Sequence, residues 1–247
     1  MEGKNSTKKY LVEFICTFLI TLITLWSFKS YYLQEIGFFT LSVINGITSM
    51  FCIWFGYQHS GAHFNPSLTF AKLMVGGFDF MTAISYIVVQ ILGSVLAALI
   101  TIMLTPENWV EKNGMILSYP RKVNIVTDFQ CFVIEFLLSF FYVFAYYSTT
   151  QDQRANNNVF GFAIASVILF GTVAFGPLTG ACVNLVRILG PHTLSGEFND
   201  FFIYIIASVA GGVFAAFYYN LFLENAESQT ANIVISKGTM KTRENYV

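Results

Sequence analysis

The chain has 247 residues, of which 55 % are hydrophobic and 11 % are charged, and its formal net charge is -1. An ordinary globular domain carries about 25 % charged residues, so these side chains are too few to cover a surface that faces water. This excludes most soluble enzymes, and the near-zero net charge excludes the basic field of a nucleic-acid-binding protein. The four cysteines are scattered without a C-x-x-C pair, so we expect no disulfide framework, no metal site and no cofactor.

Six stretches are long and apolar enough to cross a membrane, since a bilayer core about 30 Å thick needs about 20 mostly apolar residues per helix. They cover residues 10–28, 37–55, 80–104, 129–147, 159–176 and 201–223. The pattern predicts an all-α, multi-pass integral membrane protein. Residues 1–9 precede the first span, and the polar tail 224–247 follows the last one and is expected to be disordered.

An even number of spans places both termini on one side of the membrane, and the positive residues indicate which side. Eight of the 13 lysines and arginines fall on the terminal side: Lys4, Lys8, Lys9, Lys72, Arg154, Lys237, Lys241 and Arg243. Cytoplasmic loops carry an excess of lysine and arginine. We therefore expect both termini to be cytoplasmic.

The two halves of the chain repeat one another in three blocks that occur in the same order. The paired blocks begin at Glu13 and Glu135, at Ser60 and Thr179, and at Tyr86 and Tyr204. Each half holds three spans, an odd number, so the second half enters the membrane upside down. This is the inverted 3+3 repeat of channels and transporters, with repeats at about residues 10–104 and 129–223.

The middle block ends in an asparagine in both halves, at Asn65 and Asn184, and a short apolar run follows each. These runs, residues 68–71 and 185–189, are too short to span a bilayer but suit re-entrant half-helices that line a cavity. Asparagine is a preferred helix N-cap, and Pro66 suits the first helical position. We expect the two asparagines to cap half-helices that meet end to end near mid-membrane.

Over residues 8–223 the chain resembles the aquaporin, or major intrinsic protein, family. The motifs that carry the resemblance are E-x3-T-F from residue 13, S-G-A-H-F-N-P-S from residue 60, Y-x3-Q-x2-G from residue 86, and T-G-x3-N-x2-R-x2-G-P from residue 179. Both signature Asn-Pro-Ala triplets are altered, to Asn-Pro-Ser at residue 65 and Asn-Leu-Val at residue 184. The resemblance implies six tilted helices plus two half-helices in residues 10–223, one pore per chain, and a homotetramer.

The resemblance also implies roles for particular residues. Asn65 and Asn184 are expected to donate hydrogen bonds to passing molecules at the positive ends of two helix dipoles, where cations and protons meet a barrier. Glu13 and Glu135 are expected to hold the re-entrant loops through backbone hydrogen bonds. The carbonyl groups expected to line the conduit belong to Gly61, Ala62, His63, Gly180, Ala181 and Cys182.

Four positions correspond to the selectivity filter of the family. Counting back twenty residues from Asn65 gives Asn45, counting back twelve from Asn184 gives Thr172, and Ala181 and Arg187 complete the ring. Water-selective relatives have an aromatic residue and a histidine at the first two positions. Because both are missing, we expect a wider constriction that is polar on two sides and that offers no aromatic corner.

We therefore predict a passive channel and not an enzyme, which conducts water and to some degree small neutral solutes while excluding protons and ions. One alternative is an aquaglyceroporin-like channel with glycerol, urea or ammonia as the main permeant. A second is a secondary transporter with Glu13 and Glu135 as its coupling groups. An intramembrane enzyme is disfavoured because no Ser/His or paired-Asp arrangement is visible. The expected partners are membrane lipid, water and small neutral solutes, and no nucleic acid. The expected location of the protein is the plasma membrane or an internal vacuolar membrane.

Overall fold

Helices and loops make up the part of the chain that the computed structural model describes, residues 3–113, 116–151 and 159–224. Six helices are long and apolar enough to cross a membrane: α1 (Gly3–Tyr32), α2 (Phe38–Ser60), α4 (Phe80–Leu104), α6 (Asp128–Thr150), α7 (Phe160–Thr179) and α9 (Phe201–Tyr218). A π-helical segment, Tyr219–Glu224, continues α9. The predicted fold class and its six spans are confirmed, whereas the predicted disordered tail lies outside the described residues from residue 225 onward.

Helices α1, α2, α6 and α7 extend beyond the predicted apolar runs, and polar side chains cap the starts of α4 and α6. Thr127 and Gln130 form a capping box at the start of α6, in which the Thr127 amide donates to Gln130 Oε1 at 2.9 Å. At the start of α4, Asp79 accepts a hydrogen bond from the Thr82 amide at 2.9 Å. Such caps satisfy amide groups that the first helical turn leaves free.

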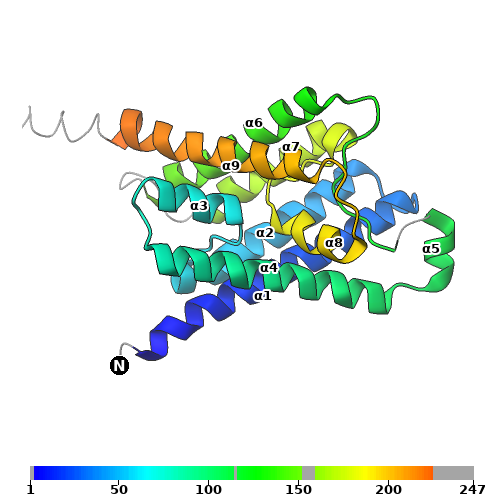
Figure 1. The fold of residues 1–247 in the computed structure, drawn as a ribbon, viewed down its shortest axis with the longest axis horizontal. Coiled ribbons are helices and arrows are strands. Elements are labelled where there is room, and N and C mark those ends of the chain that lie inside the picture. The colour runs from blue at the N-terminus through cyan, green and yellow to red at the C-terminus, as the bar shows by residue number, and fades with distance from the viewer. Residues whose placement is uncertain (1–2, 114–115, 152–158, 225–247) are drawn as a thin grey trace, which may run out of the picture.

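Three shorter helices complete the described fold. These are α3 (Pro66–Met74), α5 (Glu107–Asn113) and α8 (Val186–Ser195). Figure 1 shows α3 and α8 in opposite halves of the bundle, between α4 and α9. Helix α3 packs mainly against α9, in the second half of the chain, while α8 packs against α4 in the first half. The two halves therefore interlock through their short helices.

The closest helix crossings depend on glycine at equivalent places in the two halves. Among the described helices, the packing of α1 on α4 and of α6 on α9 is the most extensive. A Cβ atom at Gly93 of α4 would lie 2.6 Å from the Phe14 carbonyl oxygen, and one at Gly211 of α9 would overlap the Phe136 carbonyl oxygen. Small residues permit this approach of backbones in membrane bundles.

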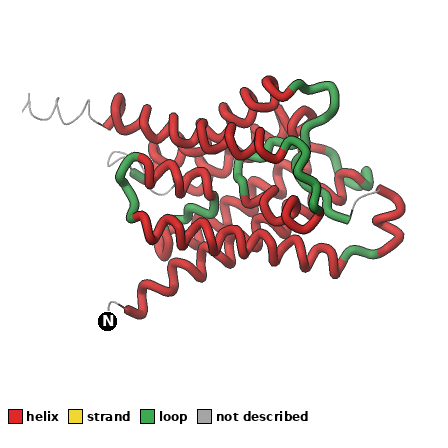
Figure 2. The backbone as a smooth tube through the Cα atoms, viewed as in Figure 1, coloured by secondary structure: helices red, strands yellow, loops and turns green. Residues whose placement is uncertain are grey.

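Apolar side chains cover the outside of the bundle, while several charged side chains lie within it. Among the most exposed side chains are Phe39, Met81, Met103, Phe129, Phe202 and Phe222. Glu13, Glu135 and Arg187 are fully buried. This distribution suits a protein whose surroundings are lipid. Both ends of the described chain lie at the same end of the bundle, and loop segments lie both at its two ends and within it (Figure 2).

Candidate functional site

Two irregular segments lead into the half-helices, and their backbone conformations match. The residues with positive φ in the first segment are Gly61 (81°), Ala62 (51°) and Phe64 (46°), and those in the second are Gly180 (75°), Ala181 (48°) and Val183 (57°). Non-glycine residues adopt this left-handed conformation at a cost of roughly 1–2 kcal/mol each. The surrounding structure must therefore hold these segments in place.

Glu13 of α1 holds the first segment. Its Oε1 accepts hydrogen bonds from the Ser60 hydroxyl (2.7 Å) and the His63 amide (3.0 Å). Its Oε2 accepts from the Phe64 amide (2.8 Å) and from Nε2 of Gln90 (2.8 Å). Both carboxylate oxygens thus receive two donors, which compensates for burying a charge.

Glu135 of α6 holds the second segment in the same way, but with fewer donors. Its Oε1 accepts from the Thr179 hydroxyl (2.7 Å) and the Cys182 amide (3.0 Å), and its Oε2 accepts from the Val183 amide (3.1 Å). Ser208 stands where the first repeat has Gln90, and its hydroxyl has no hydrogen-bond partner among the described residues. These contacts are the ones that the resemblance implied for both glutamates.

Each segment ends in an asparagine that caps the following half-helix. Asn65 Oδ1 accepts from the Ser67 amide (3.0 Å), and Asn184 Oδ1 accepts from the Val186 amide (3.1 Å). The predicted capping contacts are therefore present at both sites. Helix α8 nevertheless begins at Val186, so that Leu185 and not Asn184 is its flanking residue.

The backbone explains this difference between the two half-helices. The Asn65 carbonyl accepts from the Thr69 amide (3.0 Å), four residues on, as in an α-helix. The Asn184 carbonyl accepts from the Arg187 amide (3.1 Å), three residues on, which is the tighter 3₁₀ pattern common at helix ends. The second half-helix therefore starts with a tighter turn.

The two asparagines also join the half-helices end to end. Asn65 Nδ2 donates to the Val183 carbonyl (3.3 Å), and Asn184 Nδ2 donates to the Phe64 carbonyl (2.8 Å). The predicted meeting of the half-helix ends is thus present although Leu185 replaces proline. The N-termini of both half-helices, with their positive dipole ends, converge on this place.

Arg187 of α8 is fully buried, and the protein engages most of its guanidinium. Nη1 donates to the carbonyls of Ala181 (2.6 Å) and Cys182 (2.9 Å), and Nε donates to Thr24 Oγ1 (3.2 Å). Nη2 is buried and has no partner within the described residues. Oγ1 of Thr172, a second predicted filter residue, is likewise buried without such a partner.

Asn45 of α2 is turned toward α1. Its Nδ2 donates to Ser27 Oγ (2.9 Å) and to the Leu41 carbonyl (2.8 Å), and its Oδ1 accepts from the Thr24 hydroxyl (2.7 Å). Both amide hydrogens and the oxygen are therefore engaged by the protein itself. The place of Asn45 in the selectivity filter stays a prediction.

Some of the predicted carbonyl groups also accept protein hydrogen bonds. The Gly61 carbonyl accepts from the Tyr146 hydroxyl at 2.8 Å, and Arg187 occupies those of Ala181 and Cys182. A carbonyl oxygen has two lone pairs, so each of them retains room for a second donor. Ala62, His63 and Gly180 lie in the same two segments.

His63 lies in an aromatic environment beside the first segment. Its Nδ1 is 3.1 Å from Thr69 Oγ1, and its ring is 4.8 Å from that of Phe78, 5.2 Å from Tyr86 and 5.9 Å from Tyr146, measured between ring centroids. This packing fixes the orientation of the imidazole. The sequence order alone did not indicate these partners.

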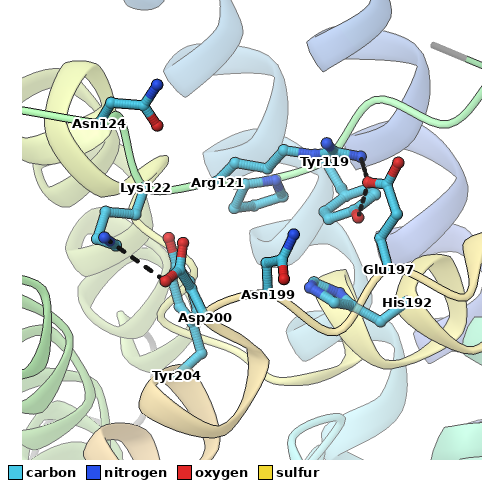
Figure 3. Close-up of a pocket in the computed structure, with 10 residues that line it drawn as sticks. Tyr119, Arg121, Lys122, Asn124, His192, Glu197, Asn199, Asp200 and Tyr204 are labelled. Atoms are coloured by element: carbon cyan, nitrogen blue, oxygen red, sulfur yellow. Dashed lines mark hydrogen bonds and ion pairs between the residues drawn. The ribbon is translucent and has the colours of Figure 1, made fainter. Parts of the chain in front are cut away.

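A pocket of about 200 Å³ lies outside the predicted site, between residues 119–124 and the segment that links α8 to α9 (Figure 3). Arg121 pairs with Glu197 at 2.9 Å, and Lys122 pairs with Asp200 at 3.5 Å. A Cβ atom at Gly180 would lie 2.7 Å from the Arg121 amide nitrogen. The two ion pairs thus hold residues 119–124 over the start of the second re-entrant segment, which sequence reasoning missed.

Comparison with known proteins identifies the family. The model of the major intrinsic protein family matches residues 1–219, nearly the whole described chain. The chain belongs to the major intrinsic protein family. Because members of this family are membrane channels, this major intrinsic protein is a channel and not an enzyme, and the predicted resemblance is confirmed.

Individual relatives agree with this assignment. The chain is 33 % identical over 190 residues to Nodulin-26 of Glycine max, and this alignment covers 77 % of this chain and 68 % of that protein. It is 31 % identical over 188 residues to Aquaporin NIP1-1 of Oryza sativa subsp. japonica, covering 76 % of this chain and 63 % of the relative. The alignments therefore leave part of each relative unmatched.

A solved structure shares the fold. The aquaglyceroporin from Plasmodium falciparum superposes with a TM-score of 0.77 at 19 % sequence identity, covering 88 % of this chain and 96 % of that one. At this identity the likeness concerns the fold alone. It supports the arrangement of six spans and two half-helices in this major intrinsic protein.

Proposed function

We propose that this major intrinsic protein is a passive channel whose main permeant is water and which also admits small uncharged solutes. The observation that carries the proposal is the crossed pair Asn65 and Asn184. Each of these amides has a second hydrogen beyond the one given to the opposite carbonyl. Those hydrogens are the donors offered to a passing oxygen atom.

The same place excludes protons and cations. Two half-helix N-termini direct positive dipole ends at the asparagines, and Arg187 adds a full positive charge nearby along the second segment. A cation that leaves water here loses its hydration and meets positive potential. Comparable barriers govern selectivity in other pores. The names of the aquaporin relatives are consistent with water as permeant.

A solute channel with glycerol, urea or ammonia as the main permeant is the second candidate. Two observations favour it. The Asn45 amide is engaged by α1 and α2, and the Phe28 ring of α1 lies 6.0 Å from Arg187 Cζ. Phe28 supplies an aromatic surface beside the arginine that the four filter positions lack, and this suits the carbon chain of a small polyol.

A proton-coupled transporter is the third reading, and the glutamate contacts argue against it. Within the described part of the chain, Glu13 accepts four hydrogen bonds and Glu135 accepts three. Protonating either group would remove the negative charge that these donors stabilise. A cycle of protonation would therefore weaken the contacts that hold the segments.

The orientation and assembly belong to the same proposal. The excess of lysine and arginine on the terminal side supports cytoplasmic termini. The exposed apolar faces of the helices support contact with lipid and with neighbouring copies in a homotetramer. The host membrane would be the plasma membrane or an internal vacuolar membrane.

Stopped-flow light scattering on proteoliposomes tests the permeant. Wild-type protein is exposed in turn to inward gradients of sucrose, urea and glycerol, and each rate is compared with that of protein-free vesicles. Water as the main permeant predicts a larger acceleration of the sucrose-driven shrinkage than of the solute-driven swelling. A larger acceleration with urea or glycerol would favour the second candidate, and no acceleration in any gradient would overturn the channel.

A further inference from the structure

A chain of hydrogen bonds connects Arg187 with α1 and α2. Arg187 Nε donates to Thr24 Oγ1 (3.2 Å), the Thr24 hydroxyl donates to Asn45 Oδ1 (2.7 Å), and Asn45 Nδ2 donates to Ser27 Oγ (2.9 Å). The Ser27 hydroxyl closes the chain on the Thr24 carbonyl at 2.9 Å. All four residues lie at or below 5 % exposure. This set is called the Thr24 relay below.

The direction of every bond in the relay is fixed by its first member. A guanidinium is only a donor, so Thr24 Oγ1 must accept from Arg187 and its own hydrogen is free for Asn45 Oδ1. The Asn45 amide then presents both hydrogens to acceptors, Ser27 Oγ and the Leu41 carbonyl. Bonds aligned in this way in a buried site polarise one another and strengthen.

The Thr24 relay and the carbonyl contacts leave one guanidinium nitrogen of Arg187, Nη2, without a partner among the described residues. Nε is taken by Thr24, and Nη1 by the carbonyls of Ala181 and Cys182. The Phe28 ring lies 6.0 Å from Cζ, one helical turn beyond Thr24 on α1. Nη2 is the guanidinium nitrogen for which the described residues provide no partner. A buried donor of this kind is costly unless something else accepts from it.

We propose that Thr24 is a positioning residue that sets solute specificity: oriented by Asn45, it fixes the Arg187 guanidinium so that Nη2 is presented to the permeating molecule. This inference rests on the proposed channel function. It assigns a selectivity role to α1, outside the four filter positions that the resemblance supplied. Asn45 then acts through Thr24 and does not contact the solute.

The buried polar groups that have no partner among the described residues indicate which solutes the filter would bind. Nη2 of Arg187 is a charged donor, and Thr172 Oγ1 both donates and accepts. A small neutral molecule with an acceptor oxygen and its own N–H or O–H groups, such as urea or glycerol, is matched by this pair. Water depends less on the exact position of Nη2, because the neighbouring water molecules in the pore can replace a missing hydrogen bond. The relay should therefore affect solutes more than water.

The test is the ratio of urea permeability to water permeability in proteoliposomes of full-length protein. Thr24→Val keeps the size of the side chain and removes the hydroxyl, and we expect the ratio to fall about fivefold, the loss of roughly one well-placed hydrogen bond. Thr24→Ser restores the hydroxyl and should restore the ratio. Thr24→Ala removes the hydroxyl with less bulk and provides the same test should the valine variant not reconstitute.

Two further variants separate the relay from simple packing. Thr48→Val is the matched control, because the Thr48 hydroxyl on α2 donates to its own helix at Ile44 (2.8 Å) and should leave the ratio unchanged. Asn45→Leu should lower the ratio as Thr24→Val does, and the double variant should lower it no further, since both changes break one relay.

The outcomes distinguish this inference from the function beneath it. An unchanged ratio in Thr24→Val and Thr24→Ala, in protein that conducts water, would overturn the relay and leave the channel intact. A fall of equal size in Thr48→Val would do the same, because it would show a packing effect. Wild-type vesicles that conduct neither water nor urea would overturn the proposed function itself, and the relay's role with it.

Discussion

Asn65 and Asn184 each donate a side-chain amide hydrogen to the carbonyl of the residue that precedes the other, at 3.3 Å to Val183 and 2.8 Å to Phe64. Each asparagine also caps its own half-helix through its side-chain oxygen. The pair therefore fixes the ends of both half-helices at once. Its two remaining amide hydrogens are the donors available to a permeating molecule.

Replacing Asn184 with aspartate tests this arrangement. The change removes the donor to the Phe64 carbonyl and sets a carboxylate against that oxygen, so we expect either a loss of about 1–3 kcal/mol in stability or, in assembled protein, leakage of cations. Proton and potassium flux into reconstituted vesicles measures the leak. Asn199→Asp, an exposed position that lines the pocket beside residues 119–124, adds the same charge and should not leak. Normal water flux with no leak in Asn184→Asp would refute the barrier.

The carboxylate contacts predict an order among variants of Glu13. Gln keeps one accepting oxygen and so retains two of the four hydrogen bonds, whereas Ala keeps none. We expect Glu13→Gln to lower the thermal midpoint and Glu13→Ala to prevent assembly, since uncompensated amide groups cost about 1–3 kcal/mol each. Size-exclusion profiles and thermal unfolding in detergent measure this. Equal, pH-dependent loss of flux in both variants would instead indicate proton coupling.

The glycine crossings predict a sharp contrast between two alanine substitutions. Gly211→Ala would force a methyl group against the Phe136 carbonyl, so α6 and α9 must separate, at a cost of about 1–3 kcal/mol or more. Gly37→Ala is the control, because Gly37 directly precedes α2 and a Cβ atom there would meet nothing within 4 Å. Thermal unfolding should show a large loss for the first variant and little change for the second. Similar midpoints would contradict the tight α6–α9 crossing.

His192 predicts a pH dependence of stability. It lies outside the membrane-spanning helices, its ring is 4.6 Å from that of Tyr119, and burial lowers its pKa below the usual 6.5. The unfolded chain therefore binds a proton near pH 6.5 that the folded chain does not. Since the unfolded state then holds more protons, stability falls as the pH drops below 6.5.

The corresponding experiment compares wild type with His192→Gln in thermal unfolding between about pH 7.5 and pH 5. The midpoint of the wild type should decline more steeply as the pH falls, because only the wild type has His192. The other nearby titratable groups, His63, Glu197 and Asp200, are the same in both proteins. Parallel curves would show that His192 does not contribute to the acid sensitivity.

A double substitution tests the filter positions. Asn45→Phe restores an aromatic side chain and breaks the Thr24 relay, and Thr172→His narrows the opposite side. We expect the pair to reduce urea and glycerol permeability about tenfold while sparing water, in line with the discrimination that a filled pocket provides. Stopped-flow swelling in solute gradients measures this. Wild-type protein that already excludes both solutes would refute the assignment of these positions.

Much of the architecture could be predicted because it depends on local patterns. Apolar length defined the six spans, and the duplicated Gly-Ala-x-x-Asn block placed both half-helices. The Thr24 relay could not be predicted in this way. In the sequence Thr24 is one polar residue in an apolar run, and its role depends on Arg187, 163 residues away in the chain.

Other misses have similar causes. The hydrogen bond from Tyr146 to the Gly61 carbonyl joins elements that no shared motif connects. The pocket beside residues 119–124 depends on how the segments at Arg121 and Glu197 pack, and loops of this kind carry little periodic signal. The start of α8 at Val186 follows from a tight first turn that the substitution of leucine for proline did not specify.

The measurement that tests the central claim most directly is the osmotic shrinkage rate of wild-type proteoliposomes in a sucrose gradient, with a proton-sensitive dye enclosed. The proposed channel predicts shrinkage several-fold faster than in protein-free vesicles, with the internal pH unchanged when a proton gradient is imposed. Shrinkage no faster than that of bare lipid, or internal acidification that depends on the protein, would contradict a water channel that excludes protons.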